Sequence, residues 1–253
     1  MRSLFRYRSQ ETPAIEPLPA VFPLVQGAEI AAAVAGQRTA GDFYDSLRVS
    51  PERVLFGLMD LAGRREDNGS ILAAAQQTFR TLGAELFSKV DINESDAMTE
   101  LSLRINRNLI EVSHGVHPCP AFIGCYHEKF GTLCYTNAGH TPGLLRDSRG
   151  IVELPSTGLP LGLFSHATLE APTVGMAKGA GLLLVSRGVL ECGSESHDPD
   201  GEFGLERVKE AFGHTSLDRA QPLCESILDT ADKFSQVTAF CDDRTALALM
   251  RTA

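Results

Sequence analysis

The arrangement of apolar and polar residues predicts alternating strands and helices. The apolar run from Val54 to Met59 closes on Asp60, and such a run is typical of a strand that is covered on both faces. The run from Leu182 to Val185 is bounded by glycines and predicts a second buried strand. Arg187 follows in a turn at its carboxyl end. Side chains at the ends of buried strands are commonly presented to a functional site, so we expect Arg187 to contact a particular group there.

Two segments between these strands have the spacing of amphipathic helices. From Gly69 to Phe87, and again from Ser95 to Val112, apolar residues recur at intervals of three and four, as on a helix with one buried face. These residues are Leu72, Ala75, Phe79, Leu82 and Leu86 in the first segment, and Met98, Leu101, Ile105, Leu109 and Val112 in the second. Asn93 or Ser95 is available as the N-cap of the second helix.

The remaining pattern completes an α+β fold. Residues 121–155 predict consecutive hairpins, residues 203–212 and 221–234 predict helices, and the acidic pair at 242–243 leads into a last strand. The simplest arrangement is two antiparallel sheets packed together, with helices outside. Residues 1–21 contain several prolines and predict an extended arm, so we expect one domain over residues 22–253.

Composition limits the class of partner. The 253 residues are 43% hydrophobic, enough to bury the core of one large domain. The 32 acidic and 23 basic residues give a net charge of −9, which disfavours nucleic acid or an anionic membrane as the main partner. The start of the chain has no continuous apolar segment, so we expect neither a signal peptide nor a membrane anchor and predict a cytoplasmic protein. The six cysteines are dispersed, which favours buried reduced thiols.

Candidate chemistry gathers where strands begin and end. The acidic residues at these boundaries are Asp42, Asp45, Asp60, Asp242 and Asp243. Carboxylates that converge from separate elements suit a hard divalent cation such as magnesium or manganese. For any single aspartate, a role in capping a turn is the commoner one. Their spacing alone does not decide between the two.

The order of motifs carries a resemblance. The segments "GDFYD", "LFGLMDLAG", "YTNAGHTPGLLRD", "GLPLGLF", "LLLVSRGVLE", "GEFGLERV" and "DDRTALAL" together resemble the SpoIIE-like branch of the PPM (type 2C) metal-dependent serine/threonine phosphatases. The resemblance runs from about residue 22 to the end and implies a free-standing catalytic domain, folded as a four-layer α-β-β-α sandwich. It also implies Mn²⁺ or Mg²⁺, one or two ions, whose activated water attacks the phosphorus of a phosphoserine or phosphothreonine. The implied substrate is a phosphorylated protein, such as a STAS-type anti-anti-sigma factor in a partner-switching pathway.

The resemblance assigns roles to particular residues. Asp60 resembles the carboxylate that bridges two metals, and the Leu61 carbonyl resembles the next ligand of the first metal. Asp42 resembles the acid that holds metal-bound water. Asp242 resembles a ligand of the second metal. Gly63 stands where the following loop must stay tight.

Arg187 departs from the family pattern, because it replaces the aspartate of a Thr-Asp-Gly strand end that binds the second metal. Arginine has five donors, no acceptor and a permanent charge, so it cannot ligate a cation. In one hypothesis Arg187 substitutes for that cation by pairing with Asp60 and Asp242, which leaves an impaired phosphatase that binds phosphoproteins. In the other, Arg187 points to solvent and Asp243 or Asp45 supplies the missing ligand.

Other candidates carry alternatives of their own. Arg64 and Arg65 either bind the substrate phosphate or belong to a solvated, internally paired loop. His114, His117 and Cys119 have the donor types of a soft metal site. A zinc site needs about four ligands and no matching second half is evident, so a loop that happens to contain them is the better explanation. His140 either orders its turn or takes part in acid/base catalysis.

Overall fold

The chain forms two five-stranded sheets that pack face to face. We describe it from a computed structural model, which describes residues 17–36, 40–113, 117–193, 201–235 and 243–252. The strands are β1 (Ala28–Ala35), β2 (Ala40–Ser50), β3 (Arg53–Arg64), β4 (Ala121–His127), β5 (Thr132–Ala138), β6 (Gly143–Asp147), β7 (Gly150–Leu154), β8 (Thr173–Gly175), β9 (Gly181–Val185) and β10 (Arg244–Arg251). The helices are α1 (Arg65–Phe87), α2 (Glu94–Ser113), α3 (Arg187–Leu190), α4 (Gly204–His214) and α5 (Ala220–Ser235).

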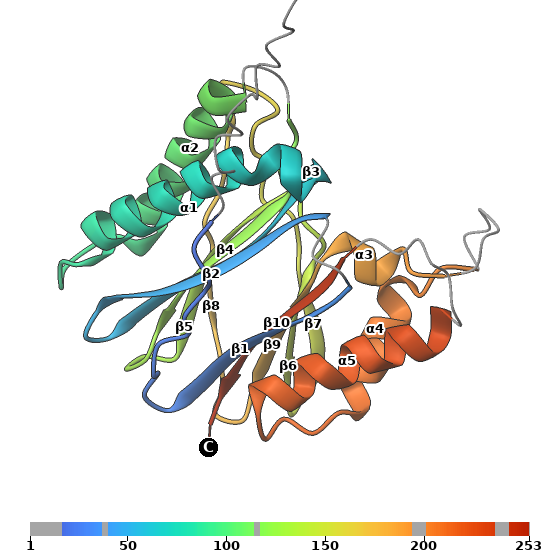
Figure 1. Ribbon diagram of the computed structural model, residues 1–253. Coiled ribbons are helices and arrows are strands. Elements are labelled where there is room, and N and C mark those ends of the chain that lie inside the picture. The colour runs from blue at the N-terminus through green and yellow to red at the C-terminus, as the bar shows by residue number, and fades with distance from the viewer. Residues whose placement is uncertain (1–16, 37–39, 114–116, 194–200, 236–242, 253) are drawn as a thin grey trace, which may run out of the picture.

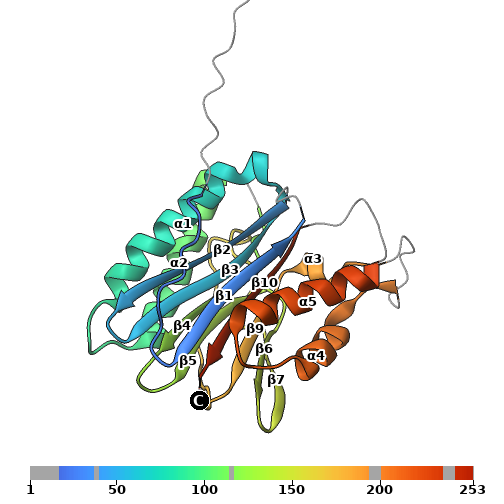
Figure 2. The ribbon, with the colours of Figure 1, turned by 60° about the horizontal axis from the view of Figure 1, so that its bottom comes forward.

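The order of the strands produces a four-layer sandwich. One sheet has the order β1-β10-β9-β6-β7 and the other β2-β3-β4-β5-β8, and the strand pairs within both are antiparallel. The helices α1 and α2 cover the outer face of the second sheet, and α4 and α5 cover that of the first (Figures 1 and 2). The predicted α+β sandwich flanked by helix pairs is therefore confirmed.

Three apolar layers hold the sandwich together. One lies between α1, α2 and the β2–β8 sheet, one between the two sheets, and one between the β1–β7 sheet and α4, α5. The predicted helix faces enter the first layer: Leu72, Phe79, Met98 and Ile105 are at most 1% exposed. All seven residues of β4 are buried, because this strand is central in its sheet and covered on both faces.

Several boundaries differ from the predictions. The first helix begins at Arg65 rather than Gly69, and β3 runs to Arg64, so the predicted loop after Asp60 is wrong. Asn93 is the cap of α2, since its Oδ1 accepts hydrogen bonds from the N–H groups of Ser95 (3.1 Å) and Asp96 (3.4 Å).

The proline-containing segment before β1 lies against the sandwich. Residues 17–24 form neither helix nor strand. The Leu18 N–H donates to Gln76 Oε1 at 2.7 Å, and Gln76 Nε2 donates to the Leu18 carbonyl at 2.8 Å, so an α1 side chain holds the backbone of this segment. Residues 1–16 of the predicted arm lie outside the described residues. Within the described part, no helix has the length and apolar character that crossing a lipid bilayer requires. The five cysteines described there are buried and free.

Candidate active site

Two acids face each other at one end of the sandwich. Asp42 of β2 lies directly opposite Asp60 of β3 in the antiparallel register. The pairing of β3 with β4 ends at Met59 and Ala121, and the Asp60 N–H then donates to the Pro120 carbonyl at 2.8 Å. The two aspartates therefore stand at the rim of the sheet, where a ligand from solvent can reach them.

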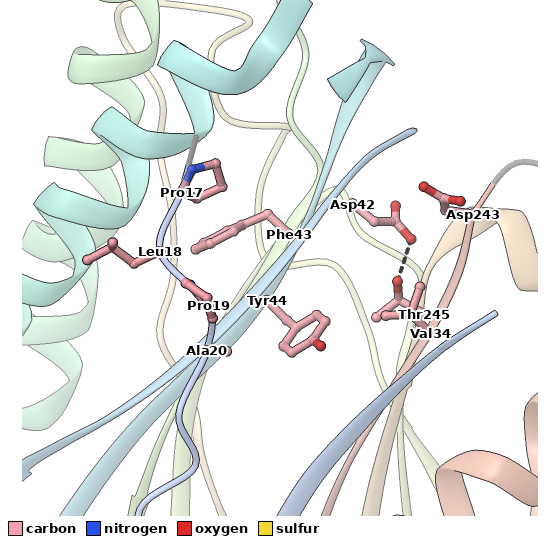
Figure 3. Close-up of a pocket in the computed structure, with 10 residues that line it drawn as sticks. All are labelled: Pro17, Leu18, Pro19, Ala20, Val34, Asp42, Phe43, Tyr44, Asp243 and Thr245. Carbon is pink, nitrogen blue, oxygen red and sulfur yellow. Dashed lines mark hydrogen bonds between the residues drawn. The ribbon is translucent and has the colours of Figure 1, made fainter. Parts of the chain in front are cut away.

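The other sheet closes over Asp42. Thr245, near the start of β10, donates from Oγ1 to Asp42 Oδ2 at 2.7 Å, and Figure 3 shows this bond crossing between the sheets. Burial, then the charge of Asp60 and to a smaller extent that of Asp243, raise the pKa of Asp42 to about 7, while hydrogen bonds from the Thr245 and Ser186 side chains act in the opposite direction. We call this end of the sandwich, with Asp42, Asp60 and Asp243, the acidic edge. Its negative charge is only partly compensated by the hydroxyl groups of Thr245 and Ser186.

Glycine brings the Leu61 carbonyl to this edge. A Cβ on Gly41 would lie 1.8 Å from the Leu61 carbonyl oxygen, so only glycine permits the contact between β2 and β3 at this point. The strand register shifts between Ala40 and Gly41, beside Asp42. Gly63 has a φ of +107°, and a Cβ there would lie 3.2 Å from Asn68 Nδ2 in the first turn of α1. The tight backbone that we expected at Gly63 is present.

Arg187 lies at the outer side of the same edge. Its Nε is 3.9 Å from Asp60 Oδ2 and 3.6 Å from Glu191 Oε1, and 55% of its side chain is exposed. It is the first residue of the short helix α3, directly after Ser186. Arg187 therefore reaches one of the two aspartates that we expected it to contact. Asp242, the other, lies outside the described residues.

Of the two acids proposed as a replacement ligand, only Asp243 is near. It is 3% exposed and contributes to the raised pKa of Asp42, and it lies against Gly36 at the end of β1. Asp45 is on the opposite face of β2, because side chains three positions apart on a strand point to opposite sides. Its carboxylate binds Arg80 and Gln76 of α1. The hypothesis that Asp45 supplies a metal ligand is wrong.

The remaining candidates are Arg64, Arg65, Cys119 and the histidines near it. Arg64 ends β3 and Arg65 begins α1, so they do not form the solvated loop that we considered, and the positions of their side chains fall outside what is described. Burial, followed by the charge of Asp60, raises the pKa of the Cys119 thiol to about 12, so this thiol is protonated near pH 7 in the metal-free protein. His117 has no hydrogen-bond partner on either ring nitrogen among the described residues, and His114 lies outside them.

His140 is placed in a turn by backbone contacts. Its N–H donates to Asn137 Oδ1 at 2.9 Å, and its Nδ1 lies 3.1 Å from the Thr141 carbonyl oxygen. Burial lowers the pKa of His140 to about 4, so the ring is neutral near pH 7. This environment favours a role in ordering the turn over one in proton transfer.

A pocket opens beside Asp42 on the side of the sandwich. It has a volume of about 150 Å³ and lies between residues 17–20, β1, β2 and β10. Asp42, Asp243 and Thr245 form its polar wall, and Figure 3 shows Tyr44 below Asp42 on the same strand.

Sequence reasoning missed Ser186 and Thr245. Both hydroxyl residues are fully buried at the acidic edge. A signal was available, since each is a single polar residue at the end of an apolar strand, in "LLLVS" and "TALALM".

Comparison with known proteins assigns the family. The profile described as "Stage II sporulation protein E (SpoIIE)" matches residues 50–252. The chain belongs to the SpoIIE family. Its fold is that of PPM phosphatase domains: the SiaA-PP2C domain of Pseudomonas aeruginosa superposes with a TM-score of 0.72 at 17% identity, over 88% of this chain and 86% of that chain. The predicted resemblance is confirmed.

Two curated proteins are related in sequence to this SpoIIE-family domain. Protein IcfG of Synechocystis sp. is 24% identical over 215 residues, which are 77% of this chain and 33% of that protein. The phosphoserine phosphatase RsbP of Bacillus subtilis is 23% identical over 158 residues, 62% of this chain and 38% of that protein. The chain thus spans little more than a third of the length of these relatives.

The described donors of the SpoIIE-family domain fit a hard cation in part. Two facing carboxylates and a nearby backbone carbonyl are oxygen donors of the kind that Mg²⁺ and Mn²⁺ prefer, and Mg²⁺ commonly uses one or two carboxylates while keeping several waters. In the part of the chain that the structure describes, no three histidine, cysteine or acidic side chains converge closely enough to hold an ion by themselves. The chemistry of Asp42, Asp60 and Leu61 therefore fits one ion with open positions for water.

Proposed function

We propose that the protein is a metal-dependent phosphoserine/phosphothreonine protein phosphatase that uses Mn²⁺ or Mg²⁺. The observation that carries this proposal is the register of Asp42 opposite Asp60, with a pKa of about 7 at Asp42. Facing carboxylates repel each other, and a divalent cation between them would relieve this repulsion. The family of the chain, which is one of serine/threonine phosphatases, supports the same chemistry.

Each residue of the acidic edge would have its own role in holding the ion or its water. Asp60 and the Leu61 carbonyl would hold the ion, Asp42 would orient a water that the ion coordinates, and Asp242 is proposed as a further ligand. When bound, the ion supplies an activated water and neutralises charge on the phosphoryl oxygens. Arg187, more than half exposed beside Asp60, is suitably placed to attract an incoming phosphate. Arg64 and Arg65 remain proposed as additional phosphate contacts.

The proposed substrate is a phosphorylated protein, and we propose a STAS-type domain of a partner-switching pathway. The name of one relative, a phosphoserine phosphatase, supports the choice of phosphoserine. A net charge of −9 supports a protein partner over a nucleic acid or an anionic membrane.

A second candidate function follows from the contact between Arg187 and Asp60. If the guanidinium replaces the second metal, the domain would bind phosphoproteins with little or no turnover. The contact is long, at 3.9 Å, and Arg187 also lies 3.6 Å from Glu191. Because ion pairs this exposed contribute about 0–1 kcal/mol, a divalent cation would compete well for Asp60. The geometry therefore favours the active enzyme.

The decisive experiment measures hydrolysis of p-nitrophenyl phosphate and of a phosphoserine peptide with Mn²⁺. We expect the wild-type protein to turn over and Asp60→Asn to lose activity by at least about 100-fold. The control Asp229→Asn, an exposed position on α5, should keep wild-type activity. An inert wild-type protein would contradict the proposal. If Arg187→Asp then gained activity while the exposed Arg107→Asp did not, the binding-module function would be supported instead.

A further inference from the structure

We propose that Thr245 and Ser186 are positioning residues, whose hydroxyl groups together fix the carboxylate of Asp42 in the orientation that metal binding requires. The inference rests on the proposed function, because it concerns how the same acidic edge is prepared for an ion. Neither residue would contact the ion or the phosphate.

The two hydroxyl groups form a continuous link from one sheet to the other. Thr245 Oγ1 donates to Asp42 Oδ2 at 2.7 Å, across the sandwich. The Thr245 N–H donates to Ser186 Oγ at 3.0 Å, and the Ser186 N–H donates to the Thr245 carbonyl at 2.9 Å. The Ser186 hydroxyl accepts one hydrogen bond in this way, and its own hydrogen is directed to Asp42. Asp42 thus has hydroxyl partners on both Thr245 and Ser186, and both of these residues are fully buried.

The side chain of Ser186 does not cap α3, although Ser186 is at the N-cap position of this helix. It is the N-cap residue of α3, with φ −69° and ψ 163°, and a serine there usually accepts a hydrogen bond from the first turn of the helix. No such bond is made by its side chain. The hydroxyl points instead to Thr245 and Asp42. The sequence therefore forgoes a local stabilising contact in favour of one at the acidic edge.

The charges around Asp42 explain why two donors are needed. Asp42 lies opposite Asp60 in the strand register and lines the same pocket as Asp243, and hydrogen bonds from neutral donors stabilise a carboxylate that lies beside other acids. The hydrogen bond from Thr245 to Oδ2 restrains rotation of this carboxylate away from Asp60. Partners that orient the groups around a metal ion before it arrives typically contribute 10- to 100-fold to metal affinity or activity.

The test is Thr245→Val, which removes the hydroxyl and keeps the shape and the backbone link to Ser186. We expect the dissociation constant for Mn²⁺, measured by calorimetry on the full chain, to rise by about 10- to 100-fold. Thr245→Ser restores the donor and should remain within about threefold of wild type. The matched control is Thr136→Val, which removes another buried hydroxyl from a strand, β5, away from the acidic edge. A wild-type affinity in Thr245→Val, or an equal loss in Thr136→Val, would overturn the inference.

The outcome can be separated from that of the proposed function. If the wild-type protein itself binds no Mn²⁺, the proposed function fails, and crystal structures of the metal-free proteins then decide about the hydroxyl pair. A carboxylate of Asp42 that rotates away in Thr245→Val, and keeps its wild-type orientation in Thr245→Ser, would support the positioning role. An unchanged orientation in Thr245→Val would overturn it.

Discussion

Arg80 binds both carboxylate oxygens of Asp45: Nε donates to Oδ2 at 2.7 Å, and Nη2 donates to Oδ1 at 3.0 Å. Asp45 is 1% exposed on β2, whereas 27% of the Arg80 side chain on α1 is exposed. Gln76 adds a third donor at 3.1 Å. A fully bonded carboxylate thus joins α1 to the strand that carries Asp42 on its other face.

Removing Arg80 should destabilise the fold. In Arg80→Met, the buried Asp45 loses its only described countercharge, and we expect the free energy of unfolding to fall by about 2–3 kcal/mol, below the usual range for a buried pair because Gln76 remains. Urea denaturation measures this change. Arg104→Met is the control, since Arg104 and Glu100 are exposed and their loss should cost at most about 0.5 kcal/mol. Equal losses in both variants would mean that the buried pair contributes no more than a surface one.

Gln76→Ala should release the segment before β1 without unfolding the domain. The variant removes both hydrogen bonds to the Leu18 backbone, while Asp45 keeps Arg80. We expect hydrogen exchange at the Leu18 amide to accelerate by about tenfold, which corresponds to one or two net hydrogen bonds. Gln77→Ala, at the exposed neighbouring position, should leave the rate unchanged. A Leu18 amide that exchanges equally fast in all three proteins would show that Gln76 does not hold this segment.

The local sequence predicts an element correctly where the burial of one face determines its structure. The spacing of Leu72, Ala75 and Phe79 predicts their helix because an amphipathic helix must bury one side, and all three are at most 1% exposed. By contrast, β1 is "AEIAAAVA", and its local pattern does not predict a strand, because alanine favours helices. Its conformation follows from pairing with β10, which lies more than 200 positions away in the sequence.

The candidate site was predictable only as far as the family motifs reach. They identify Asp42 and Asp60, which the structure brings together, but not the face on which Asp45 lies, because that depends on recognising residues 40–50 as one strand. The link between Ser186 and Thr245 joins residues 59 positions apart. Such contacts arise from the order of strands in the sheet, which the local pattern does not contain.

Gly41→Ala should disrupt the acidic edge. A Cβ would lie 1.8 Å from the Leu61 carbonyl oxygen, so β2 and β3 must separate beside Asp42. We expect a loss of about 1–3 kcal/mol in the free energy of unfolding, together with weaker Mn²⁺ binding by calorimetry. Gly175→Ala on β8 is the control, because a Cβ there meets nothing within 4 Å. If Gly41→Ala behaved like Gly175→Ala in both measurements, the Leu61 carbonyl would not depend on this close approach.

The buried ring of His140 should make the fold sensitive to acid. Burial lowers its pKa from 6.5 to about 4. Between these two values the unfolded chain binds a proton that the folded protein does not, so the free energy of unfolding decreases as the pH falls. The decrease attributable to His140 should reach about 3 kcal/mol near pH 4. Asp42 has the opposite effect, because its raised pKa lets the folded protein bind the extra proton.

Comparing two variants isolates the contribution of His140, since Asp42 titrates equally in both. In His140→Gln, unfolding free energies from urea denaturation should fall less steeply between pH 7 and pH 4, so the advantage of the wild-type protein should shrink as the pH falls. His166→Gln, at an exposed position, should give a profile parallel to wild type. If the difference between wild type and His140→Gln were the same at every pH, the ring would accept its proton as easily in the folded protein as in the unfolded chain, and its burial would carry no acid sensitivity.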